Sequence, residues 1–140
     1  MLLHIVARGR IGRSPEAELV DRYLKRISWP TRISELPDRG GREPDRPAQG
    51  KRILLDEKGD VLGSIDFAER LGRWRDDGVR EARFLIGAAD GFDDGERAAA
   101  DLLISFGRAT WPHLLARAML AEQLFRATSI LANPPAPRAG

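Results

Sequence analysis

Short apolar runs alternate with longer segments of helical periodicity along this chain, and that alternation restricts its fold more than any other feature. The expected strands cover residues 2–7, 31–37, 51–55, 81–86 and 102–107. The expected helices cover residues 15–27, 65–77, 95–101 and 114–131. Strands that alternate with helices in this way predict an α/β protein with a mostly parallel sheet of five or six strands, flanked by helices.

Three boundary signals support this order of elements. Ser14 is followed by Pro15 and two glutamates, the pattern of an N-cap before the first turn of a helix. Ser64 is the expected N-cap of the second long helix, which Gly78 ends. Turn residues at 56–59 are expected to end the third strand.

Two segments carry little that a core could bury. Residues 38–50, DRGGREPDRPAQG, are polar apart from Ala48 and are expected to form a loop. Residues 132–140 form a tail whose prolines exclude both helix and strand. At 140 residues the chain has the length of one ordinary domain, and we expect a single domain over 1–140.

Composition excludes several kinds of chemistry. The chain has no cysteine and two histidines, so disulfides and thiolate nucleophiles are excluded. No metal site is expected, with carboxylate-bound magnesium as the alternative left open. No apolar run is long enough to cross a membrane, so a soluble cytoplasmic protein without a membrane partner is expected. The formal net charge is +2 and the pI is near 9.5, with arginine the main basic residue. RNA is therefore a reasonable partner, although an ordinary solvated surface has the same composition.

Ligands of parallel α/β sheets bind beyond the carboxyl ends of the strands. Three loops are expected at that edge, at residues 56–63, 87–93 and 107–113. None of them has the glycine spacing of an ATP-binding or dinucleotide-binding loop. Taken alone, Gly87 and Gly91 favour an ordinary turn, and a loop whose main chain holds a ligand is the alternative.

The last helix carries the most distinctive polar side chains. His113 falls in its first turn, where it could bind a substrate or cap a turn. Glu122 and Arg126 have the order and spacing of an ordinary ion pair on a helix, which is an alternative to a role in chemistry.

Four motifs become specific when they are taken together in this order. They are LLD at 54–56, FLIG followed by DG at 84–91, TWPHLLARAMLAEQLFRA at 110–127, and Asn-x-Pro with a later arginine near the end. With these motifs the chain resembles the family of ribosomal RNA large subunit methyltransferase H, which are small SPOUT-type enzymes. They use S-adenosylmethionine to methylate N3 of a pseudouridine in 23S ribosomal RNA. The resemblance implies an α/β fold with a C-terminal trefoil knot, and a homodimer.

The resemblance also implies where the site lies. The methyl donor would be wrapped by three loops, whose residues here are Leu55, Gly87, Ala88, Gly107, Arg108, Ala109, Thr110, Trp111 and Pro112. The catalytic positions carried over from the family are His113, Glu122, Arg126 and Arg138. Arg117 and Arg126 are alternatively expected to contact RNA phosphates.

The chain departs from the family pattern at four places, one of which is Phe125, where a tyrosine is common. The family loop usually reads Gly-Gly-Pro-Glu-Gly, and Ala88 stands here at its second position. If that position needs a positive φ, the alanine costs on the order of 1 kcal/mol and loosens the donor pocket. The polar loop 38–50 replaces a family helix, and the tail after Asn133 lacks two histidines and a tyrosine.

Three hypotheses follow from these observations. The first is a methyltransferase acting on a pseudouridine of 23S ribosomal RNA, in the large subunit or the assembled ribosome. The second is a degenerate relative that binds RNA or S-adenosylmethionine with weak or no transfer, because the tail is altered. The third is an α/β module for a small ligand without a role on RNA, because the charges nearly balance.

Overall fold

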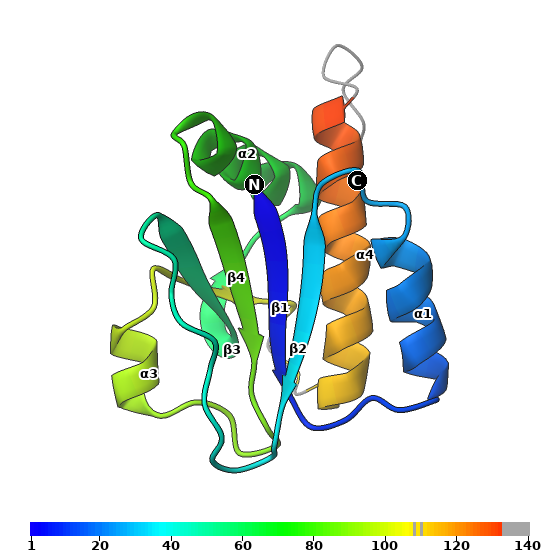
Figure 1. Cartoon of the computed structure of the whole chain (residues 1–140), viewed down its shortest axis with the longest axis vertical. Coiled ribbons are helices and arrows are strands. Elements are labelled where there is room, and N and C mark those ends of the chain that lie inside the picture. The colour runs from blue at the N-terminus through cyan, green and yellow to red at the C-terminus, as the bar shows by residue number, and fades with distance from the viewer. Residues whose placement is uncertain (108, 110, 133–140) are drawn as a thin grey trace.

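The computed structural model, which describes residues 1–107, 109 and 111–132, is built around a five-stranded parallel sheet (Figure 1). The strand order is β2-β1-β4-β3-β5, and every neighbouring pair is parallel. The strands are β1 (Leu2–Arg8), β2 (Thr31–Leu36), β3 (Gly50–Val61), β4 (Glu81–Ile86) and β5 (Leu102–Ser105). The helices are α1 (Pro15–Leu24), α2 (Ser64–Asp76), α3 (Asp94–Ala98) and α4 (His113–Ala132). The predicted α/β fold with a mostly parallel sheet is confirmed.

One face of the sheet is covered by α2 and α4, and it holds the main hydrophobic core. Alternate residues of the central strands point to this face, including Ile5, Ile53 and Phe84, all of which are fully buried. The ring of Phe67 on α2 packs edge-to-face on Phe84, with 5.9 Å between the ring centroids. The apolar side chains that β1, β3 and β4 direct to this face thus fix the positions of α2 and α4.

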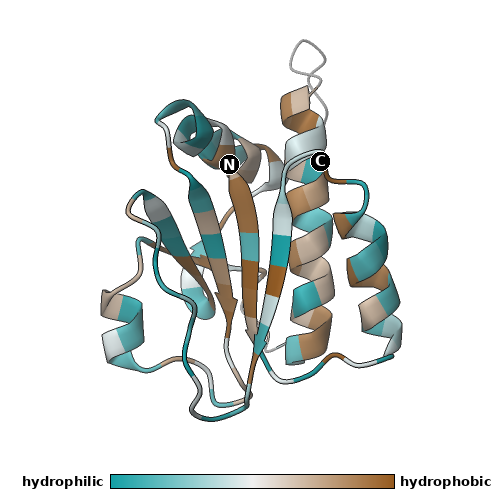
Figure 2. Ribbon diagram, in the orientation of Figure 1, coloured by the Kyte–Doolittle hydropathy of each residue, from teal (hydrophilic) through white to brown (hydrophobic). Residues whose placement is uncertain are grey.

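The opposite face of the sheet is divided between an apolar half and a polar half. Near the carboxyl ends of the strands, Val6, Leu54 and Leu85 form a small cluster that Phe92 covers. Near the amino ends, the inward positions of the same strands carry polar side chains instead. The segment that crosses this face between β2 and β3 is mostly hydrophilic, as Figure 2 shows, and so matches the polar half of the sheet that it covers.

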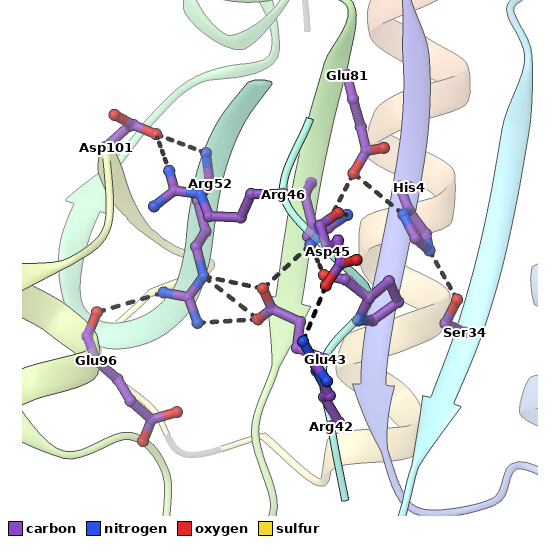
Figure 3. A network of polar contacts seen from close by, with 12 residues as sticks. His4, Ser34, Arg42, Glu43, Asp45, Arg46, Arg52, Glu81, Glu96 and Asp101 are labelled. Carbon is purple, nitrogen blue, oxygen red and sulfur yellow. Dashed lines mark hydrogen bonds and ion pairs between the residues drawn. The ribbon is translucent and has the colours of Figure 1, made fainter. Parts of the chain in front are cut away.

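A buried network of charges occupies the polar half (Figure 3). The Arg83 side chain is 4% exposed and donates from Nε to Glu81 across 2.7 Å and from a terminal nitrogen to Glu43 across 3.1 Å. Glu43 also accepts from Arg52 at 3.0 Å, and Glu81 contacts the ring of His4 at 3.1 Å. Each buried charge therefore has an opposite charge beside it, which low-dielectric surroundings require.

The network attaches the predicted polar loop 38–50 to the sheet. Arg83 donates to the main-chain oxygens of Pro44 and Asp45 across 2.6 and 2.8 Å. Asp101, just before β5, accepts from the main-chain N–H of Arg52 at 2.7 Å. The prediction that residues 38–50 form an irregular loop is confirmed. The loop covers one face of the sheet through hydrogen bonds and ion pairs, whereas a helix in this place would cover it through apolar contacts.

Two local expectations were wrong. The third strand does not end at Leu55, because β3 continues to Val61 after an irregularity and pairs with β5 again. Gly59 allows this, since a Cβ at that position would lie 2.6 Å from the main chain of Ile104. Ser64 does not cap α2; Gly63 occupies the N-cap position and no side chain bonds there. Ser64 instead donates to Gln123 of α4 at 3.0 Å.

Candidate active site

A cavity of about 550 Å³ lies at the edge of the sheet where β4 and β5 end, beside the middle of β3, whose Leu55 pairs with the last residue of β4. We call it the rim cavity. Its walls are residues 55–57, 86–92, 104–107, 109, 111–113, 97 and 116. This is the edge at which parallel α/β proteins bind ligands, and the volume is typical of a small-molecule site.

The first wall is the turn that follows β4. The N–H of Gly91 donates to the carbonyl of Ala88 at 2.9 Å, and Gly91 has a φ of 74°. Ala88 has no positive φ, since the described residues with positive φ are all glycines. The expected strain at Ala88 is therefore absent, because the left-handed residue of this turn is Gly91.

Gly87 is the more restricted position of the same turn. A Cβ there would lie 3.3 Å from the Phe92 ring and 3.4 Å from the carbonyl of Gly91. Phe92 is buried in the apolar cluster on the adjacent face of the sheet. The bare backbone at Gly87 thus allows the turn to fold back on itself beside the cavity.

An ion pair that the sequence did not reveal supports the second wall. Asp56 accepts from Arg97 across 2.7 Å and from the N–H of Lys58 across 2.9 Å. Burial alone raises the pKa of Asp56, but these donors outweigh it and hold the pKa below its ordinary value. Arg97 lies on α3, which the capping box of Asp93 and Glu96 begins. The charged pair therefore connects β3 to the short helix after the Gly87 turn.

The third wall is the segment between β5 and α4. The hydroxyl of Ser105 donates to the carbonyl of Gly107 at 2.6 Å and accepts from its N–H at 3.1 Å. Gly107 has a φ of 124°, a conformation that other residues rarely adopt. Trp111, 42% exposed, lies at the mouth of the cavity. Arg108 and Thr110, both expected to bind the donor, lie outside the described residues.

His113 links the rim cavity to the loop after β1. Its ring lines the cavity, and its Nε2 would lie 3.4 Å from a Cβ placed on Gly9. Asp38 approaches the same point, with its Oδ1 3.1 Å from that Cβ position. His113 is therefore in place to meet a ligand in the cavity.

Arg117 does not lie on the surface, and the expectation that it contacts RNA phosphates was wrong. Its side chain is 1% exposed and is paired with Glu35 of β2. It also donates to the carbonyl of Gly9 at 3.1 Å. Burial opposes ionisation of Glu35, yet the hydrogen bonds from Arg117 and Ile11 keep its pKa below the ordinary value. Arg117 thus holds the β1 and β2 ends against α4.

The other expected catalytic positions lie away from the cavity or outside the described residues. Glu122 and Arg126 form an ion pair on α4, with Arg126 Nε 3.0 Å from the carboxylate, and neither lines the rim cavity. Arg138 lies outside the described residues. Of the four expected catalytic residues, the structure places His113 at the cavity.

The described residues limit the chemistry at this edge. They include no group of three or more histidine, aspartate or glutamate side chains arranged to hold a metal ion. No helix among them is long and apolar enough to cross a membrane. The rim cavity offers glycine backbone and apolar side chains, together with the paired Asp56 and Arg97 and the carboxylates of Glu57 and Asp90. This lining suits an organic ligand held largely by the main chain.

The fold and the position of the cavity define the class: an α/β protein with a cavity at the edge of the sheet where β4 and β5 end. A solved structure of a probable methylase family protein from Haemophilus influenzae Rd KW20 has the same fold, with a TM-score of 0.59 and 12% identity. That alignment covers 95% of this chain and 67% of the other.

Sequence comparison gives the family. The family described as "Predicted SPOUT methyltransferase" matches residues 1–135. Two similar proteins, each named Ribosomal RNA large subunit methyltransferase H, come from Rhizorhabdus wittichii and Zymomonas mobilis. They are 74% and 60% identical to this chain, and each alignment covers all of both proteins. The chain belongs to the SPOUT methyltransferase family and is a methyltransferase, which confirms the resemblance seen in its motifs.

Proposed function

We propose that this enzyme transfers the methyl group of S-adenosylmethionine to N3 of a pseudouridine in 23S ribosomal RNA of the large subunit. The observation that carries the proposal is the rim cavity, which brings the three motif-bearing loops around one space. The names of the similar proteins and the arginine-rich composition support RNA as the substrate. A cytoplasmic location, where ribosomes are found, is part of the proposal.

The residues around the cavity fit the methyl donor. Its adenosine and amino acid parts need apolar contact and main-chain hydrogen bonds, which Leu55, Gly87 and Ala88 are placed to supply on one side. Gly107, Ala109 and the 111–112 segment are placed to supply them on the other. When bound, the donor provides an electrophilic methyl group, so the protein's main task is to hold it in line with the acceptor nitrogen.

The acceptor nitrogen must lose a proton before it can attack. His113 is the titratable side chain at the cavity edge best placed to meet the base, and we assign it the role of contacting the pseudouridine ring. Glu122, Arg126 and Arg138 are proposed as further catalytic residues. Because Glu122 and Arg126 do not line the cavity of their own chain, their participation requires a second subunit.

A homodimer built around α4 would meet that requirement. Two large exposed apolar residues adjoin this helix among those described: Trp111 precedes it, and Ile65 follows Ser64, which bonds to Gln123 of α4. Such side chains are candidates for burial between subunits. Family membership supports the dimer and also the trefoil knot, in which the C-terminal part of the chain passes through a loop.

A degenerate enzyme is the second candidate, favoured by the altered tail after Asn133. Two measurements separate the candidates. Calorimetric titration of the folded protein with S-adenosylmethionine tests the cavity assignment, and absence of binding would rule out donor use. Mass spectrometry of 23S ribosomal RNA from a strain lacking the gene tests catalysis. Loss of one methylpseudouridine, restored by the wild-type gene, is the expected result; persistence of the modification without a second enzyme to make it would favour the degenerate relative.

A further inference from the structure

The loop between β1 and α1, residues 9–13, carries two exposed arginines beside the rim cavity. Gly9 lies against the His113 ring at the cavity edge, and Arg10 follows it directly. The side chains of Arg10 and Arg13 form no hydrogen bond or ion pair with the part of the chain that the structure describes. Both guanidinium groups are therefore available to a partner that approaches the cavity.

The backbone of this loop is already fixed. The N–H of Gly9 donates to Leu36 across 2.8 Å, and its carbonyl accepts from the buried Arg117 at 3.1 Å. The N–H of Ile11 donates to Glu35 across 2.8 Å. Gly9 and Gly12 have φ angles of 88° and 59°, which shape the turn. A partner would thus meet a loop that needs little ordering on binding.

The charges around the loop favour an anion. Glu35, the nearest strand carboxylate, is paired with Arg117; Arg10 lies close enough for its charge to help lower the pKa of Glu35, but it forms no hydrogen bond or ion pair there among the described residues. Arg8 donates to the main-chain oxygens of Pro37 and Gly40, so its positive charge is held in place and is not neutralised there. Arg39 in the next segment is exposed. Asp38 is the carboxylate that adjoins Gly9, so positive charge predominates at this side of the cavity.

The basic surface has clear limits. On the far side of the rim cavity, Asp90, Asp93 and Asp94 are exposed and negatively charged. On the near side, Glu16 and Glu18 begin the acidic first turn of α1. A polyanion that reaches the cavity would therefore follow the ends of β1 and β2, over the 9–13 loop.

We propose that the 9–13 loop binds the phosphate backbone of the substrate RNA, with Arg10 and Arg13 contacting phosphates next to the nucleotide that enters the cavity. This rests on the proposed action on ribosomal RNA. Arginine suits the role, because its planar fork donates two parallel hydrogen bonds to a phosphate. Arg117 and Glu35 are then positioning residues, since they fix the main chain from which these arginines project.

The test uses the double variant Arg10→Gln, Arg13→Gln with ribosomes from a strain lacking the gene. The initial rate of methyl transfer from labelled S-adenosylmethionine is measured against ribosome concentration at several salt concentrations. We expect a severalfold rise in KM for ribosomes with kcat little changed. The slope of log(kcat/KM) against log[salt] should become shallower by about 1 to 2, as loss of two phosphate contacts requires. Calorimetric affinity for S-adenosylmethionine should not change.

A matched control removes two arginines from the opposite edge of the sheet. Arg73 on α2 and Arg80 before β4 are exposed, and their double glutamine variant changes the net charge by the same amount. Equal changes in both double variants would overturn the inference, because net charge alone would then explain them. An active wild type with an unchanged Arg10→Gln, Arg13→Gln variant would overturn the inference and leave the proposed function standing. A wild type that methylates no ribosome would overturn both.

Discussion

Arg97 of α3 donates a hydrogen bond from Nε to Oδ2 of Asp56 across 2.7 Å, and both side chains line the rim cavity. The Asp56 side chain is 3% exposed and the Arg97 side chain 23%, so solvent screens this pair only partly. The pair is the main polar link between β3 and α3, and the Gly87 turn lies between β4 and that helix. It therefore determines how firmly one wall of the cavity is held.

The variant Arg97→Met keeps most of the apolar stem and removes the charge. Asp56 is then left buried with the N–H of Lys58 as its remaining donor, so the free energy of unfolding should fall by more than the loss of an exposed ion pair would cause. Affinity for S-adenosylmethionine should fall as well, because the wall becomes mobile. Urea unfolding and calorimetry measure the two effects.

Lys25→Met provides the comparison for that variant. Lys25 pairs with Asp21 on the surface of α1, with both side chains more than half exposed, so its loss should cost about 0.5 kcal/mol or less. If Arg97→Met were as mild as Lys25→Met and left donor affinity intact, the Asp56 pair would have no part in holding the wall.

The turn after β4 gives opposite expectations for two adjacent residues. Ala88→Gly should leave donor affinity within about twofold of wild type, because Ala88 needs no positive φ. Gly87→Ala should weaken donor binding by about tenfold, because its Cβ would lie 3.3 Å from the Phe92 ring. Calorimetric titration of both variants checks this, and a loss of affinity in Ala88→Gly alone would contradict the assignment of strain to Gly91.

Arg117 is expected to act on stability and not directly on RNA. Arg117→Met leaves the carbonyl of Gly9 and the carboxylate of Glu35 without their buried donor, so the free energy of unfolding should fall by about 3 kcal/mol. Glu35→Gln keeps a neutral acceptor but leaves the guanidinium of Arg117, which is 1% exposed, without its anionic partner, so it should be at least as destabilising as Arg117→Met. Urea unfolding of the three proteins gives the comparison. If Arg117→Met left the unfolding curve unchanged and raised the KM for ribosomes, the hypothesis that Arg117 contacts RNA phosphates directly would be supported after all.

Local sequence rules predict the elements well where the deciding contacts are close in the chain. Ser14 accepts from the N–H of Ala17 and Pro15 is the first helical residue, as the sequence indicates. The apolar runs of β1 and β4 are nearly all buried, as expected of central parallel strands. Two of the motifs end a strand or lead into a helix at the edge where the cavity lies: FLIG ends β4, and TWPH leads into α4. The LLD motif lines the same cavity from within β3.

The sequence did not predict features whose partners are far apart in the chain. Arg83 interrupts an apolar strand, and its burial depends on Glu43 and on two carbonyls about 40 positions earlier. Arg117 lies on a mostly apolar helix, and the partner that accounts for its burial, Glu35, lies 82 positions away. The extension of β3 depends on the close approach of Gly59 to β5. No local periodicity contains such information, because the pairing is decided by tertiary packing.

His4 should make stability depend on pH. Its side chain is 1% exposed, with Nδ1 3.1 Å from Glu81 and Nε2 2.8 Å from the hydroxyl of Ser34. Burial lowers its pKa below 6.5 and outweighs the opposing effect of Glu81, while Arg83 and Arg32 lower it further. The folded protein thus takes up a proton less readily than the unfolded chain. The contribution of neutral His4 to stability is complete above pH 6.5 and is lost as the pH falls from there through the folded pKa.

His4→Gln separates this titration from the hydrogen bonds around it. Glutamine can still donate to Glu81 and accept from Ser34, but it does not titrate, so the fall in stability below pH 6.5 should be smaller in the variant than in wild type. Urea unfolding at closely spaced pH values from about 7.5 to 5 covers the window in which histidine titrates. Parallel pH profiles for the two proteins would mean that His4 does not contribute. In that case the loss of stability in acid would come from the carboxylates Glu35 and Asp56. Their pKa values are lowered, so their contribution to stability is lost at a lower pH than that of His4.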